Sequence, residues 1–206
     1  IFYSTFEANK NAKFIFCSSS QIFKKKYGLV DEKSKVVATT NYTKFRINSH
    51  NLMMKFKKKN NIKYTNIILF NHDSKFRNKK FIIPKVINAI LNKDLIFLKK
   101  IIKMNVASDF SHALDFCEGI KKIMFKSLNL DTIILSSKKL ISLNKIISFI
   151  IKKNKLDIKL LIKDKKIKGL IGNNMLARNK INWSPKKNIF IAANEIYKFY
   201  KQNRYK

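Results

Sequence analysis

Lys13-Phe-Ile-Phe-Cys-Ser18 is the stretch that decides the fold, because aromatic and β-branched residues between polar ones predict a buried strand. A second run of the same kind, Thr-Asn-Ile-Ile-Leu-Phe at 65–70, predicts another strand, which we place at 64–70. A short strand is expected at 132–135, and another strand at 157–162. The first strand ends in the polar residues Ser19-Ser20-Gln21, which makes this end a candidate for function.

Helices are expected between these strands. Apolar residues recur at helical spacing over 40–60, 81–93, 111–128, 141–153, 174–181 and 188–201. Pro84 is tolerated in the first turn of its helix, and a turn is expected at 183–186, which reads Trp-Ser-Pro-Lys. Strands that alternate with helices indicate a mainly parallel sheet covered by helices on both faces.

Size and composition limit the domain organisation. With 206 residues, of which 46% are hydrophobic, the chain is expected to bury one sizeable core, or one core with a small appended lobe. Cys17 and Cys117 show no metal-ligand or disulfide spacing, so we expect two ordinary buried thiols in a reduced, cytoplasmic setting. No apolar run reaches the length of a membrane span, and residues 1–10 lack the pattern of a targeting signal.

The net charge of +33 first suggests a polyanionic partner such as nucleic acid, because cations that neutralise phosphates release counterions. The basic residues are nearly all lysine, although arginine usually makes the bidentate contacts to bases and phosphates. The lysines are spread along the chain with abundant asparagine and isoleucine, which is typical of drift in an A·T-rich coding sequence. We therefore favour a compositional bias over nucleic-acid binding, and expect no membrane partner.

Five motifs, met in order along the chain, resemble one known family. The first three are Ser18-Ser19-Ser20-Gln21-Ile22-Phe23, Asn41-Tyr42-Thr43-Lys44-Phe45-Arg46 and Ile68-Leu69-Phe70-Asn71-His72-Asp73-Ser74. The others are Asp109-Phe110-Ser111-His112-Ala113-Leu114-Asp115-Phe116, and Gly172-Asn173-Asn174 with Lys180-Ile181-Asn182-Trp183-Ser184-Pro185. They resemble the GDP-mannose 4,6-dehydratase family of the extended short-chain dehydrogenase/reductases, with its patterns S-T-S-E-x-(Y/F)-G, S-P-Y-x-x-x-K, I-L-F-N-H-E-S-P, R-D-W-x-H-A-x-D-Y and G-D-x-x-K-A-x-x-x-L-x-W-x-P. The resemblance spans roughly residues 6–200.

The resemblance implies an α/β fold, namely the C-terminal part of a Rossmann-like doubly wound parallel sheet plus a small α/β substrate-binding lobe. It makes residues 1–206 a single partial NAD(P)-dependent epimerase/dehydratase domain. The remaining Rossmann strands and the catalytic helix would lie in 1–70, and the substrate-binding lobe within roughly 71–206. A nucleotide sugar of the GDP-mannose type as substrate, NADP as cofactor and a homo-oligomer are further implications.

In that family the C4 hydroxyl of the sugar is oxidised by hydride transfer to NADP, water is eliminated across C5 and C6, and the hydride returns to C6. A tyrosine, its pKa lowered by a lysine, takes the C4 hydroxyl proton, a threonine steadies the same oxygen, and a glutamate removes the C5 proton. By position, these four catalytic residues are Tyr42, Arg46, Ser19 and Gln21. The resemblance also assigns substrate binding to Asn71, Lys85 and Arg77, and cofactor binding to Tyr42, Arg46 and His72.

Two of the catalytic positions, and one further position, lack the functional group that the family pattern has there. Gln21 replaces the glutamate, and because an amide has no useful basicity near neutral pH, water elimination loses its base. Arg46 replaces the lysine and keeps the charge, but its planar fork cannot copy the ammonium's contacts to the cofactor ribose. Ser108 replaces an arginine that would bind phosphate. Lys103 and Arg77 lie close enough in sequence to compensate for the missing charge. We therefore expect impaired or absent dehydratase turnover.

The family's fold opens with a strand, a glycine-rich loop and a helix whose amides hold the cofactor pyrophosphate. None of the chain's glycines, Gly28, Gly119, Gly169 and Gly172, lies in such a loop. We therefore expect the cofactor-binding half to be missing, the first strand to have an unpaired edge, and NADP not to bind saturably to this chain alone.

Other interpretations stay open. Asn71 also suits a strand-end turn, and we prefer to see His72 and His112 as packed or capping histidines. A nucleotide-sugar 4-epimerase or reductase of the same fold would need only Ser19 and Tyr42 for redox chemistry at C4, and would form no 4-keto-6-deoxy product. From another class, a basic, non-catalytic remnant that binds nucleic acid would show salt-sensitive binding.

Overall fold

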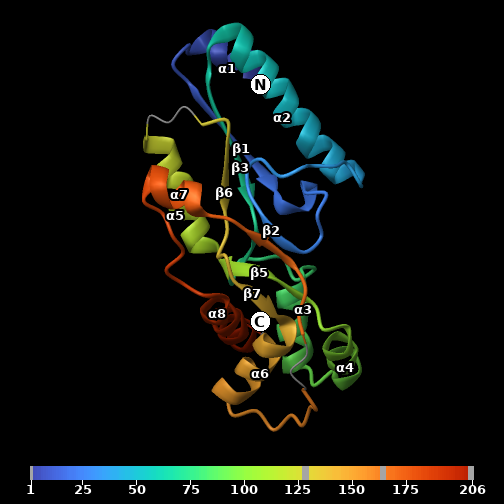
Figure 1. Cartoon of the computed structure of the whole chain (residues 1–206). Coiled ribbons are helices and arrows are strands. Elements are labelled where there is room, and N and C mark those ends of the chain that lie inside the picture. Colours follow the sequence, from blue (N-terminus) through green and yellow to red (C-terminus); the bar gives the residue numbers. More distant parts are fainter. Residues whose placement is uncertain (1, 127–129, 163–165, 204–206) are drawn as a thin grey trace.

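The computed structural model describes residues 2–126, 130–162 and 166–203. Figure 1 shows an upper part built on a sheet and a lower part that is mainly helical. The upper sheet has the order β1-β3-β6 and is parallel throughout, with β1 at Lys13–Ser19, β3 at Lys63–Leu69 and β6 at Thr132–Leu135. Within the described part of the chain β1 is an edge strand of this sheet.

Helices cover both faces of the upper sheet, which confirms the predicted arrangement. α2 (Asn41–Asn60) packs on one side, and α5 (Ala113–Phe125) and α7 (Met175–Ile181) lie on the other (Figure 1). α2 begins with a capping box in which the side chains of Thr40 and Thr43 each accept from the other's backbone amide, and it ends at Asn61 in the left-handed region (φ 50°).

The core of the upper part is formed by the apolar residues that predicted the strands. Ile67, Ile68, Ile133, Ile134 and Leu135 are at most 2% exposed. Burying one such side chain contributes roughly 1.5–3 kcal/mol. Trp183 packs edge-on against Phe116 in the same core, so the segment after α7 is held against α5.

The lower part has its own sheet and core. Its strands are β4 (Asn71–Asp73), β5 (Ala107–His112) and β7 (Leu140–Ser142), with β4 parallel and β7 antiparallel to β5. Its helices are α3 (Ile82–Leu91), α4 (Leu95–Met104), α6 (Leu143–Lys153) and α8 (Ile189–Gln202). A two-stranded parallel sheet of β2 (Gly28–Val30) and β8 (Leu170–Gly172) joins segments that are far apart in the sequence.

Several predicted boundaries are wrong. The helix predicted at 111–128 begins only at Ala113, because the preceding residues form β5, and residue 128 lies outside the described residues. The helix predicted at 141–153 begins at Leu143, after β7. α1 (Phe2–Ala8) and α4 were not predicted.

The strand predicted at 157–162 is also wrong, because this segment is irregular. Its alternating apolar residues, Ile158, Leu160 and Ile162, pack against the core of the lower part and pair with no described strand. The alternation therefore reflects packing on one side of an extended segment.

The prediction of two buried thiols is wrong for Cys117, which is exposed, while Cys17 is half-buried. On α5 the buried positions are Asp115, Phe116, Gly119 and Ile123, so Cys117 lies off the buried face. No helix in the described ranges combines the length and the apolar character that a membrane span needs.

Candidate functional site

A cavity of about 410 Å³ lies where the carboxyl end of β1 meets the starts of α2, β4 and β5. Polar side chains that line it come from five segments, and include Gln21, Thr40, Asn71, Ser108 and Lys168. The carboxyl ends of parallel strands are the usual place for ligands in open α/β sheets. The cavity therefore lies where the fold favours a binding site.

Gln21 reaches the cavity because the chain turns sharply after β1. Residues Ser20–Ile22 form a short 3₁₀ helix, and the hydroxyl of Ser19 caps it by accepting from the backbone amide of Gln21 at 3.3 Å. Gln21 is exposed and lines the cavity, whereas Ser19 is half-buried and does not line it. The predicted pair is thus adjacent, but only Gln21 faces the cavity.

Tyr42 and Arg46 lie on the first turns of α2 and contact each other. The guanidinium carbon of Arg46 is 4.9 Å from the centre of the Tyr42 ring, which is a cation–π distance. Arg46 Nη1 donates to the carbonyl oxygen of Cys17 at 2.7 Å, and its Nε is buried without a hydrogen-bond partner in the described structure. Arg46 therefore ties α2 to the end of β1, and neither Tyr42 nor Arg46 lines the cavity.

Asn71 and Ser108 come together on the cavity wall. The Asn71 side-chain amide donates to the hydroxyl of Ser108, which stands where the family motif has an arginine. Asn71 is the first residue of β4, so it belongs to a strand and not to a strand-end turn. The structure thus places the predicted substrate-binding asparagine beside the position of the lost phosphate clamp.

Three lysines that the sequence analysis did not single out line the same cavity: Lys25, Lys26 and Lys168. Lys25 and Lys26 reach back to the carbonyl oxygens of Leu29 and Phe23, at 3.3 and 3.4 Å. In a chain with 45 lysines and arginines, no sequence signal distinguishes these three from the rest. They bring positive charge to the cavity that Ser108 lines, at the position where the family motif has an arginine.

The cations predicted to compensate for Ser108 (Lys103 and Arg77) and those predicted to bind substrate (Lys85 and Arg77) lie elsewhere. Arg77 pairs with Asp73 at 3.7 Å and lies over the ring of Phe81 at 3.6 Å, and Lys103 is exposed on α4. Lys85, on α3, is exposed as well. None of these three cations lines the cavity.

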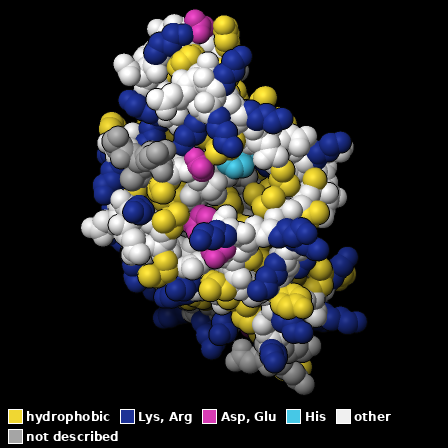
Figure 2. Space-filling view, turned by 45° about the horizontal axis from the view of Figure 1, so that its top comes forward, with side chains coloured by type: hydrophobic (Ala, Val, Ile, Leu, Met, Phe, Trp, Pro, Cys, Tyr) yellow, Lys and Arg dark blue, Asp and Glu magenta, His cyan; other side chains and the backbone are white. Residues whose placement is uncertain are grey.

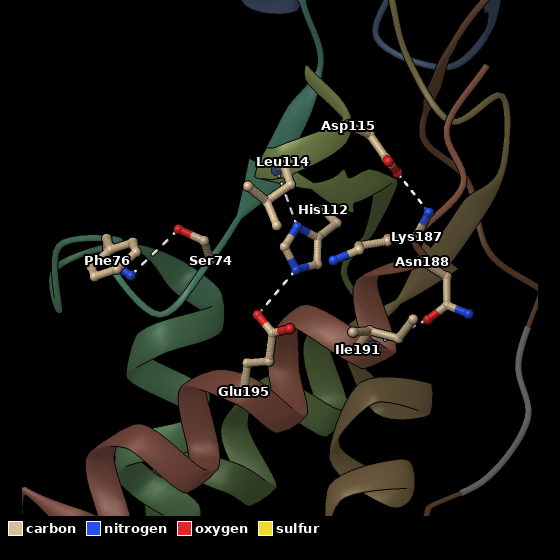
Figure 3. A network of polar contacts seen from close by, with 9 residues as sticks. All are labelled: Ser74, Phe76, His112, Leu114, Asp115, Lys187, Asn188, Ile191 and Glu195. Carbon is tan, nitrogen blue, oxygen red and sulfur yellow. Dashed lines mark hydrogen bonds and ion pairs between the residues drawn. The ribbon is translucent and has the colours of Figure 1, made fainter. Parts of the chain in front are cut away.

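The two histidines have structural roles. His72 donates from Nδ1 to the carbonyl oxygen of Phe70 at 2.8 Å and stacks on Phe116, and burial lowers its pKa. His112 caps α5 by accepting from the amide of Leu114 at 3.1 Å, and its Nε2 lies 3.1 Å from Glu195 (Figure 3). Neither histidine lines the cavity, which agrees with the preferred interpretation of packed or capping residues.

The described residues do not fit a complete nicotinamide cofactor. Arg46, at the position of the ribose-binding lysine, gives one nitrogen to Cys17, and His72 is packed against Phe116. Gly172 ends β8 shortly before α7, but the backbone amides of Gly172 and Asn173 donate to Asp109 and Val30, so they do not form a cradle for a pyrophosphate. We therefore derive no reaction step through such a cofactor.

Positive charge is widespread on the surface. Figure 2 shows lysine and arginine side chains scattered over the visible face among hydrophobic and neutral ones, with few acidic groups. A polymer-binding surface would instead gather its cations along one stripe or groove. The distribution on this face favours the compositional explanation of the net charge.

Solved structures resemble the chain over nearly its whole length. A dTDP-glucose 4,6-dehydratase from Bacillus anthracis in complex with NAD matches with a TM-score of 0.79 and 14% identity, covering 98% of this chain and 66% of that one. A UDP-glucuronic acid 4-epimerase from Bacillus cereus in complex with NAD matches with a TM-score of 0.81 and 18% identity, covering 98% and 65%. A UDP-N-acetylglucosamine 4-epimerase from Methanobrevibacter ruminantium matches with a TM-score of 0.79 and 17% identity, covering 98% of this chain and 66% of that one.

At these identities the solved structures show a common fold, which confirms the predicted Rossmann-like class, and the chain spans slightly less than two thirds of their length. Curated proteins give no match to the sequence. The model of the family described as GDP-mannose 4,6 dehydratase matches residues 3–195. Because that match covers most of the sequence, the chain belongs to the GDP-mannose 4,6-dehydratase family.

Proposed function

We propose that this chain binds a nucleotide sugar of the GDP-mannose type in the cavity beside Gln21 and does not dehydrate it. The observation that carries the proposal is the cavity itself, which brings Gln21 and Asn71 together with Lys25, Lys26 and Lys168. Asn71 and the lysines suit the two phosphates of a nucleotide diphosphate sugar, and Gln21 would face the sugar. A volume of about 410 Å³ is within the range of small-molecule sites.

The absence of dehydration follows from Gln21. Removal of the C5 proton needs a base, and a carboxamide is not protonated or deprotonated near neutral pH. Chemistry at C4 of the epimerase or reductase type is the second candidate, because Ser19 and Tyr42 keep their hydroxyl groups. It is the weaker one, since neither residue lines the cavity and this chemistry needs a nicotinamide cofactor as hydride acceptor. Known structures of this fold include UDP-sugar 4-epimerases, which supports that second candidate.

Lys168→Glu is expected to weaken the binding of GDP-mannose roughly tenfold or more, because it replaces a phosphate-facing cation by an anion. Isothermal titration of the chain with GDP-mannose at low salt measures this. GDP should compete for the same site, and mannose alone should not bind detectably.

Lys99→Glu is the matched control, since it makes the same charge change on an exposed face of α4 and lines none of the cavities described here. Equal affinities of Lys168→Glu and Lys99→Glu for GDP-mannose would contradict the proposed site. A chain that bound no GDP-mannose while remaining folded by circular dichroism would contradict the proposed function.

NADP is the cofactor class that we propose for the family's reaction, and the cradle for its pyrophosphate is not among the described residues. We therefore expect no saturable binding of NADPH to residues 1–206, when the fluorescence of the nicotinamide ring is followed during titration. The same preparation should bind GDP-mannose, which serves as the control for correct folding. Saturable, stoichiometric NADPH binding would show that the chain holds the cofactor without a glycine loop.

A further inference from the structure

A second cavity, of about 420 Å³, lies between α7, the segment that joins α7 to α8, and the turn between β6 and β7. Apolar parts of its wall come from Phe110, Ile141, Met175 and Pro185. It shares no lining residue with the cavity beside Gln21. The two cavities are therefore separate candidate sites.

Cations dominate the polar wall of this second cavity. Five cationic residues line it, and no acidic residue does: Lys138, Lys139, Arg178, Lys186 and Lys187. Within the described residues, the charged ends of these five side chains make no ion pair and no hydrogen bond. Five cations of like charge around one small volume repel one another, so an anion placed among them would be favoured.

A buried carboxylate fixes the first basic segment. Asp109 Oδ1 accepts from the amide and the hydroxyl of Ser137, at 2.8 and 2.6 Å, and Oδ2 accepts from the amide of Lys138 at 3.1 Å. Lys138 itself has φ 58°, in the left-handed region, where a lysine needs such support. The hydrogen bonds of Asp109 therefore fix the conformation of the turn that carries Lys138 and Lys139.

A second buried carboxylate fixes the other basic segment. Asp115 Oδ2 accepts from the amide of Lys187 at 2.7 Å, a contact drawn in Figure 3, and its carbonyl oxygen accepts from the indole of Trp183 at 2.8 Å. Lys186 lies between these two anchored residues. A site built on segments that are held in place loses little entropy when a ligand binds.

The helix that begins at the cavity adds to the positive potential. α8 starts directly after Asn188, a lining residue, and has no acidic residue in its first turn. The amino end of a helix carries a partial positive charge that favours anions. This contribution is secondary to that of the five cationic side chains.

We propose that this second cavity binds a small phosphorylated molecule such as a nucleotide. Its phosphate would lie among Lys138, Lys139, Arg178 and Lys186, and its nucleoside or sugar part would lie against the apolar wall. A phosphate matches the charge, and Arg178 offers the fork that pairs with two phosphate oxygens. The apolar residues on the wall suit the body of a nucleoside or sugar. A polyanion is less suited, because a volume of about 420 Å³ accommodates a single small ligand.

AMP is the probe, with adenosine and inorganic phosphate as its two halves, and isothermal titration of the whole chain is the measurement. We expect AMP to bind, phosphate to bind more weakly and adenosine not to bind detectably. The double substitution Arg178→Glu with Lys186→Glu should weaken AMP roughly tenfold or more. If this charge reversal disturbs folding, the neutral variant Lys138→Gln with Lys139→Gln takes its place. It should also weaken AMP binding.

Two controls separate this site from its alternatives. Lys99→Glu with Lys100→Glu makes an equal charge change on α4 and should leave AMP binding unchanged. Lys168→Glu, which tests the nucleotide-sugar cavity, should also leave it unchanged. Loss of AMP binding in Lys168→Glu, binding of adenosine as tight as that of AMP, or equal losses in the α4 variant would each overturn the proposal.

Discussion

Asp109→Ala is expected to lower the free energy of unfolding by roughly 3–5 kcal/mol, because it leaves several buried donors without an acceptor. The carboxyl of Asp109 is fully buried and accepts four hydrogen bonds, two from Ser137, one from Lys138 and one from the amide of Gly172. These contacts join β5 to the β6–β7 turn and to β8. Burial raises the pKa of Asp109, but all four partners donate to its carboxyl oxygens, so these hydrogen bonds favour the ionised form.

Urea unfolding at pH 7.5 followed by circular dichroism measures the loss. Asp157→Ala is the control, since Asp157 is exposed in an irregular segment and should change stability by no more than about 0.5 kcal/mol. Similar losses for the two variants would mean that the Asp109 network contributes nothing beyond a surface charge. AMP binding should weaken in Asp109→Ala as well, because the turn with Lys138 and Lys139 loses its anchor.

The long elements of the fold are predictable from sequence, and the short ones are not. The helical period of α2, α3, α6 and α8 continues for several turns, so each is found within a few residues of its true bounds. β2, β4 and β8 have three residues each, which is too short for a period. Their existence depends on partners distant in sequence, as where Gly28–Val30 pairs with Leu170–Gly172.

The residues of the candidate site also differ in whether the sequence predicts them. Gln21 and Asn71 are predictable because each lies in a motif directly after a long buried strand. Lys168 is not, because its place in the cavity comes from the pairing of β8 with β2, and one lysine among so many carries no signal. The resemblance assigned Arg77 to the substrate, but the turn that follows β4 places it beside the carboxyl of Asp73.

Asp73 is a buried carboxyl group in surroundings that disfavour its negative charge. Its side chain is buried at the end of β4, and burial raises its pKa to about 7, although Arg77 acts in the opposite direction. Its Oδ1 has no hydrogen-bond partner among the described residues. Tyr200 of α8 lies close, since its hydroxyl donates to the carbonyl oxygen of Arg77 at 3.5 Å, and burial raises the pKa of Tyr200 too.

The raised pKa of Asp73 predicts that its ionisation destabilises the fold. Between pH 3.8, its ordinary value, and about 7, the folded chain holds a proton that the unfolded chain has released. Stability therefore falls as pH rises through this window, and the full penalty is present above pH 7. Asp73→Asn removes this titration. The free energy of unfolding of the variant minus that of the original chain should therefore be roughly 2–3 kcal/mol larger at pH 8 than at pH 5.

Urea unfolding of both proteins at pH 5 and pH 8 tests this, because all other titrating groups are common to the pair and cancel in the difference. Asp157→Asn, an exposed carboxyl, should follow the original chain at both pH values. The sign of the difference decides between two opposing forces on Asp73. A gain for Asp73→Asn at high pH means that desolvation outweighs the attraction of Arg77 at 3.7 Å, whereas a loss would mean that the ion pair dominates and that the pKa lies below its ordinary value.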